Sequence, residues 1–158
     1  MLLTTHALTG AFIASQTVSP FLSYPIIVAS HFLMDWIPHW DFGTGLKTAI
    51  QKAGNKAWQI KTKTAILGLG DLFTGLGLCF LFFQKTLPLQ PILWGGVFLS
   101  LLPDFLEIPP LFLNFNPFPL KQIERLHSYV FHHSLPFPQG LIPQILILNI
   151  ELDFTLAR

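Results

Sequence analysis

Apolar residues gather into four long blocks and one shorter block, and these blocks dominate the pattern of the chain. The blocks cover residues 1–18, 21–37, 64–83, 88–108 and 140–150. A helix needs about 20 apolar residues to cross the hydrocarbon core of a bilayer. The third and fourth blocks meet this length, the second comes close, and the first is marginal. The last block reaches it only if Glu151 and Asp153 are included.

This pattern predicts one all-α domain over residues 1–158, built as a multi-pass transmembrane bundle of four to five helices. Four helices are expected to cross the membrane, and the fifth either crosses it or lies in its interface. The expected helices cover residues 3–18, 21–38, 64–83, 90–108 and 139–154.

The stretch before the last block has a different character. Eight of the 13 prolines fall between Pro103 and Pro143. A proline inside a helix removes a backbone hydrogen bond and clashes with the preceding turn. We therefore expect a proline- and phenylalanine-rich irregular segment there, lying along the cytoplasmic surface of the membrane.

Composition supports a membrane protein. Charged residues make up 11% of the chain and hydrophobic residues 51%, whereas an ordinary soluble domain has about 25% charged residues. Such a chain is too apolar to be disordered, and a net charge of +1 argues against nucleic acid as a partner. The alternative is a compact soluble all-α protein, which would need more surface charge.

The first block has neither a basic start nor a clear cleavage site, so we interpret it as a retained helix.

The basic residues predict the orientation. Two connections carry most of them: Lys47, Lys52, Lys56, Lys61 and Lys63 in the first, and Lys121 and Arg125 in the second. Loops rich in lysine and arginine stay on the cytoplasmic side. Both connections are therefore expected in the cytoplasm, together with the N-terminus, and membrane lipid is the expected partner.

Under this orientation, the histidines and most acids fall near one membrane face. His31 and Asp35 are four positions apart and share one side of a helix. All six histidines and five of the eight acidic residues are expected at similar depth. Imidazole and carboxylate groups are ligands for zinc, and also for manganese or iron. The predicted ligands of a divalent metal ion are His6, His31, Asp35, Asp71 and Asp104, with His39 and His127 in reserve.

Other interpretations of the same residues stay open. His31 and Asp35 also suit a buried pair that only locks two helices together, and Asp104 follows Pro103, as acids at helix ends often do. Asp71 is the hardest to explain structurally, because a carboxylate within a bilayer is costly. Glu107 and His132 are the predicted general base or acid of a metal-dependent reaction.

Three short motifs suggest a family. They are T-H-x-L-x-G from Thr5 to Gly10, L-P-D at 102–104, and H-x4-H-H-S at 127–134. Together they resemble the small bacterial membrane-bound metal-dependent hydrolases of the YdjM-like group. The resemblance implies a multi-pass inner-membrane protein and a metal-dependent hydrolase loosely akin to zinc-dependent phospholipase C. The chain departs from the family pattern because LLPDFLE lacks a second aspartate and a histidine, and HSYVFHHS lacks an Arg-Gly pair.

The leading hypothesis is a metal-dependent hydrolase that acts at the cytoplasmic membrane face on a lipid-like or membrane-near ester or phosphoester. One alternative is a small transporter or channel subunit coupled to protons or metal ions, which needs polar residues that continue across the bilayer. The other is a non-enzymatic membrane scaffold, in which the polar residues only specify helix packing.

Overall fold

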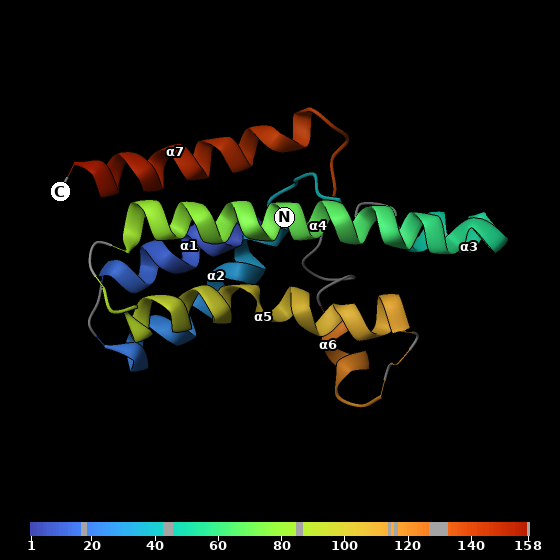
Figure 1. The fold of residues 1–158 in the computed structure, drawn as a ribbon, viewed down its shortest axis with the longest axis horizontal. Helices are drawn as coiled ribbons and strands as arrows, with labels where there is room; N and C mark the ends of the chain where they lie inside the picture. Colours follow the sequence, from blue (N-terminus) through green and yellow to red (C-terminus); the bar gives the residue numbers. More distant parts are fainter. Residues whose placement is uncertain are drawn as a thin grey trace.

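A computed structural model describes residues 1–16, 19–42, 46–84, 87–113, 115, 117–126 and 133–157. The described residues form helices and no strand, which confirms the predicted all-α class (Figure 1). The helices are α1 (Leu3–Gln16), α2 (Pro20–Trp36), α3 (Leu46–Ala53), α4 (Ala57–Phe83), α5 (Pro91–Leu113), α6 (Leu120–Leu126) and α7 (Ile142–Leu156). Two 3-10 turns, η1 (Gly54–Lys56) and η3 (Gln139–Leu141), precede α4 and α7.

A helix lies at each of the five predicted positions, but two helices are longer than expected. α4 begins at Ala57 instead of residue 64, and α5 continues to Leu113 instead of ending near residue 108. The expectation of irregular chain after residue 108 is therefore wrong as far as Leu113, and again over α6. Pro103 is buried inside α5, and helices with packed neighbours tolerate the backbone hydrogen bond that a proline removes.

Two segments have the length and composition of membrane-spanning helices. They are Gly54–Phe83, with 30 residues, and Pro91–Leu113, with 23 residues. The other predicted spans are shorter, since α1 has 14 residues, α2 has 17 and α7 has 15. At 1.5 Å per residue, α1 measures about 21 Å, less than the roughly 30 Å of a hydrocarbon core. The structure thus supports a membrane protein with two such helices, and a bundle of four to five spans is not confirmed.

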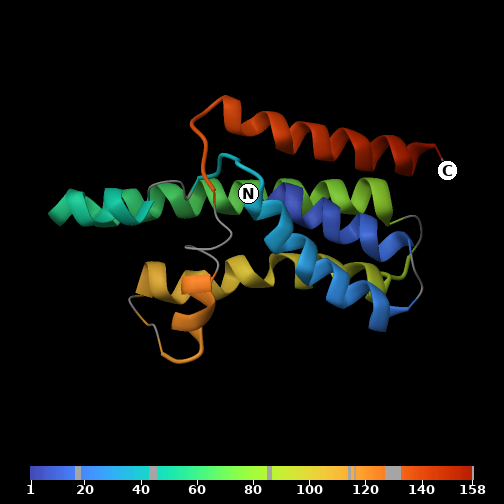
Figure 2. The ribbon, with the colours of Figure 1, turned by 180° about the vertical axis from the view of Figure 1, so that it is seen from behind.

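α1 is the central helix, with α4, α5, α2 and α7 arranged around it (Figures 1 and 2). Leu3 lies beside Asp71 and Ala7 beside Gly75, so α1 and α4 run in the same direction. Gly10 lies against Ser100, and Ala14 lies against Gly96, so α1 and α5 run in opposite directions. α1 consequently begins halfway along α4, and the first part of α4 extends beyond it.

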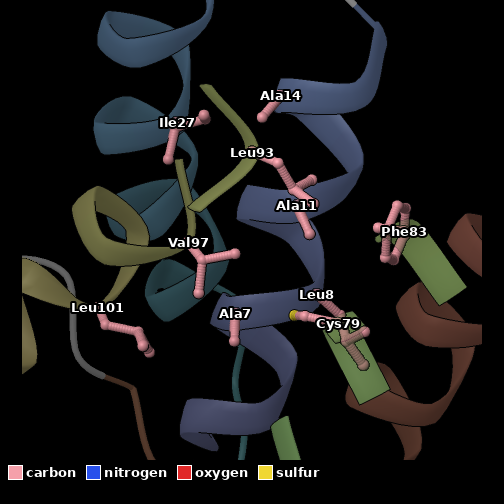
Figure 3. Packing of buried hydrophobic residues seen from close by; sticks show 10 residues of the cluster. All are labelled: Ala7, Leu8, Ala11, Ala14, Ile27, Cys79, Phe83, Leu93, Val97 and Leu101. Atoms are coloured by element: carbon pink, nitrogen blue, oxygen red, sulfur yellow. The ribbon is translucent and has the colours of Figure 1, made fainter. Parts of the chain in front are cut away.

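Small residues let these helices approach closely. A Cβ atom added to Gly10 would lie 2.5 Å from the Ser100 hydroxyl oxygen, and one added to Gly96 would lie 2.8 Å from the Cβ of Ala14. A Cβ on Gly75 would lie 2.8 Å from the Cα of Thr4. Figure 3 shows the buried core that forms around this crossing. Its members are Ala7, Leu8, Ala11, Ala14, Ile27, Cys79, Phe83, Leu93, Val97 and Leu101.

The outer surface of the bundle is rich in large apolar side chains. On α4, Phe73 is 69% exposed and Leu81 is 75% exposed. α7 has an inverted pattern, because its two buried residues are the polar Gln144 and Glu151, while Ile150 is 69% exposed. A helix that turns its polar side chains inward and its apolar ones outward is suited to apolar surroundings.

Candidate metal centre

His6, His31 and Asp104 come together where α1 begins, α2 ends and α5 passes its midpoint. One ligand atom from each lies within 4.8 Å of the other two. The imidazole rings of His6 and His31 are stacked, with centroids 4.0 Å apart. Both histidines are buried, whereas the Asp104 side chain is 20% exposed. Three helices thus bring two imidazoles and one carboxylate to the same point.

A backbone carbonyl fixes the tautomer of His31. Its Nδ1 lies 2.7 Å from the carbonyl oxygen of Ser100 on α5. Because that oxygen only accepts hydrogen bonds, Nδ1 donates, and in the neutral ring Nε2 carries the lone pair. Nε2 is 3.3 Å from Oδ2 of Asp35 and 3.9 Å from Oδ1 of Asp104. A ring oriented through its other nitrogen is the usual arrangement for a histidine that ligates a metal.

His6 offers the cluster a second imidazole. Its Nε2 is 3.1 Å from Oδ1 of Asp35, so a neutral ring donates that N–H to the carboxylate and keeps a lone pair on Nδ1. His6 Nδ1 is buried and has no hydrogen-bond partner in the described part of the chain. A buried polar atom without a partner is unfavourable, and a bound cation would relieve this cost.

Asp35 is the fully buried hub of the cluster. In addition to His6 and His31, its Oδ1 lies 2.6 Å from the α-amino group of Met1. Burial by itself lowers the pKa of that amino group, but the carboxylates of Asp35, Asp41 and Asp104 outweigh it and raise the pKa above the usual 8.0. The carboxylates therefore favour a positive charge at this point, as they would favour a metal ion.

His39 and Asp41 extend the cluster away from α2. Nε2 of His39 is 3.4 Å from Oδ2 of Asp41 and 3.7 Å from Oδ1 of Asp35, and its Nδ1 donates to the carbonyl of Ile37 at 2.8 Å. The segment before η3 holds this loop in place. The His39 N–H donates to the carbonyl of His133, and the N–H of Leu135 donates to the carbonyl of His39.

Asp71 lies outside the group of His6, His31 and Asp104, at the N-terminus of α1. Its Oδ2 accepts the backbone N–H of Leu3 at 2.6 Å, and its Oδ1 accepts that of Thr4 at 3.4 Å. The first N–H groups of a helix have no partner within the helix, and they favour a negative charge. The structure thus gives Asp71 a role that the sequence did not suggest, as a cap supplied by a neighbouring helix.

The sequence prediction missed Gln144, which connects α7 to the start of α1 and to the loop that follows α2. Its Oε1 accepts the N–H of Leu2 at 2.9 Å and the hydroxyl of Thr5 at 3.3 Å. Its Nε2 donates to the carbonyls of Trp40 at 2.7 Å and Gly140 at 3.0 Å. All four hydrogen-bonding positions of the amide are used. A lone glutamine in an apolar block was the signal that could have identified it.

The remaining predicted residues are not placed in the group. Glu107 is half-buried on α5, one turn beyond Asp104. His127 and His132 lie outside the described residues, so their predicted roles stay predictions.

The cluster lies near the middle of the two long helices and not at their ends. Asp104 has 13 residues before it and nine after it in α5, or about 20 Å and 14 Å of helix. Asp71 has 14 residues before it and 12 after it in α4. The sequence predicted these acids nearer the cytoplasmic ends, because it did not anticipate the extra turns of both helices.

No protein-family model, no curated protein and no solved structure matches the chain. The resemblance to the YdjM-like group therefore stays a prediction.

Proposed function

We propose that the protein is a membrane-embedded, metal-dependent hydrolase whose divalent ion, zinc in the first instance, is held by His6, His31 and Asp104. The observation that carries this proposal is the convergence of three ligand atoms within 4.8 Å. Tetrahedral zinc with ligands at 2.0–2.2 Å needs donor atoms about 3.4 Å apart. Small side-chain rotations would close the remaining difference.

Three protein ligands leave a fourth position for water, which is the arrangement of catalytic zinc sites. A dication held by His6, His31 and Asp104 would supply a water molecule of lowered pKa as the nucleophile. The Ser100 carbonyl orients His31, Asp35 orients His6, and Glu107 is the predicted general base. Because the cluster lies beside helices with an apolar exterior, the proposed substrate is a lipid-like ester or phosphoester. In this proposal the N-terminus is cytoplasmic and the chain crosses the inner membrane several times.

The test measures metal content and hydrolysis on the same protein. Purified protein in detergent is loaded with Zn²⁺, its bound zinc is measured by mass spectrometry, and its activity is assayed on ester and phosphodiester lipids. Asp104→Asn and His31→Gln are expected to lose both the metal and the activity. Asp71→Asn is the matched control, because it removes a half-buried acidic charge outside the group. A parent protein without stoichiometric metal would refute the proposal. Metal without hydrolysis would refute the enzymatic part.

A second candidate is a transporter coupled to metal ions or protons. It is favoured by the position of the cluster near the middle of α4 and α5, because ion sites of transporters lie near the bilayer midplane. It is also favoured by a further buried polar pair, Thr9 and Glu151, one turn deeper along α1. Zinc or proton flux in proteoliposomes without ester hydrolysis would support this function. Absence of metal, hydrolysis and flux would leave the scaffold interpretation.

A further inference from the structure

Glu151 forms a second buried polar site about one helical turn further along α1 than His6. It lies on α7, it is 7% exposed, and its Oε1 accepts the hydroxyl of Thr9 at 2.6 Å. Its Oε2 is buried without a hydrogen-bond partner in the described part of the chain. Only one of its two carboxyl oxygens therefore has a hydrogen-bond donor among the described residues.

Among the residues that the structure describes, no cation pairs with the Glu151 carboxylate. Glu151 forms no ion pair with any described residue. The titratable neighbour across the interface is the buried thiol of Cys79 on α4, and Thr9 of α1 is uncharged. On α7 itself, Asp153 is exposed. An ionised carboxylate with these neighbours would lack both a counter-ion and a full set of donors.

We propose that Glu151 is a proton-binding site that keeps its proton at neutral pH while α7 is docked on α1. The neutral acid removes the charge that the interface cannot compensate, and the Thr9 hydroxyl holds it in place. Loss of the proton would leave a buried anion between α1 and α7, so proton release and separation of α7 are linked. This site goes beyond the metal-dependent function and does not depend on it.

Infrared spectroscopy tests the protonation state directly. In detergent at pH 7, the parent protein is expected to show the carbonyl band of a buried, protonated carboxylic acid. Glu151→Gln, which has the same shape, is expected to lose this band, whereas the matched variant Glu107→Gln keeps it. A parent protein without the band, or a band that persists in Glu151→Gln, overturns the proposal.

Chemical modification supplies a second readout. Dicyclohexylcarbodiimide reacts with protonated carboxyl groups in apolar surroundings: a carboxyl oxygen bonds to the central carbon, and the acid proton moves to a nitrogen, so nothing leaves. Mass spectrometry is expected to find the adduct on Glu151, with a rate that falls as the pH rises. A water-soluble carbodiimide is not expected to reach it. A rate that does not depend on pH would contradict a proton-binding site.

The hydrogen bond from Thr9 gives a quantitative control. It stabilises the ionised form more than the neutral form, so Thr9→Val is expected to raise the proton affinity about tenfold and move the midpoint of the reaction up by about one pH unit. Thr5→Val is the matched control, because Thr5 also faces α7 but contacts Gln144 instead. Equal midpoints in the two variants would show that Thr9 does not hold the acid and would overturn the assignment of this site.

Discussion

Replacing Gln144 with leucine tests whether hydrogen bonds from α7 stabilise the fold and position the metal cluster. Leucine has nearly the same size but makes none of the four hydrogen bonds of the amide. Each bond contributes about 0.5–1.5 kcal/mol, and two of the partners left behind, on Thr5 and Gly140, are buried. Four bonds at about 1 kcal/mol each give about 4 kcal/mol, and the added apolar contact offsets part of this. We expect a loss of about 2–4 kcal/mol in the free energy of unfolding.

The same change should weaken zinc binding, because the partners of Gln144 lie next to the cluster. Leu2 is four residues before His6, and Trp40 stands between His39 and Asp41. Loss of an outer-shell contact typically lowers metal affinity about 10–100-fold, and we expect a value in this range.

Equilibrium unfolding in mixed micelles and zinc titration calorimetry measure the two effects of Gln144→Leu. Gln122→Leu is the control, since Gln122 is exposed on α6, and a surface change of this kind costs less than about 0.5 kcal/mol. If the two leucine variants unfold within about 0.5 kcal/mol of each other, the hydrogen bonds of Gln144 do not stabilise the fold. If Gln144→Leu loses stability but binds zinc with unchanged affinity, Gln144 holds α7 without positioning the cluster.

The remaining predictions concern helix packing, capping and the metal. Gly10→Val should cost about 3 kcal/mol in equilibrium unfolding, because Ser100 leaves no room for the side chain. Gly77→Ala, which has nothing within 4 Å, should instead stabilise α4 by about 0.5–1 kcal/mol, and equal effects would refute the packing argument. Asp71→Ala should cost about 1 kcal/mol through the lost cap of α1 while bound zinc stays unchanged. Zinc at 100 times its Kd should stabilise the parent protein by about 2.7 kcal/mol. Thermal unfolding should show no such gain in Asp104→Asn, and an equal gain in both proteins would place the metal elsewhere.

The positions of the helices could be predicted from the apolar blocks, because a backbone in apolar surroundings must form its own hydrogen bonds, as it does in a helix. Their ends could not, since α4 begins in the lysine-rich stretch before its apolar block and α5 continues through Pro109 and Pro110. The low helix propensity of proline describes an isolated helix. Packing on neighbouring helices and proximity to the helix end reduce its effect.

The residues of the candidate metal site could be predicted where they lie on the same helix face or at the same expected depth in the membrane. The spacing of four between His31 and Asp35 places both on one face, and the structure brings His6 and Asp104 to the same place. Periodicity cannot show which neighbour a side chain meets. Asp71 lies at the right depth but faces the start of α1, and Gln144 belongs to no motif.

The capping of α1 has a consequence for the order of folding. The first helix of the chain depends on acceptors that are made much later, since Leu3 is 68 residues from Asp71 and Leu2 is 142 residues from Gln144. The central helix is therefore synthesised before the final partners of its first N–H groups exist. The acceptor for Leu2 is made only with α7, so α7 completes the hydrogen bonding at the start of α1.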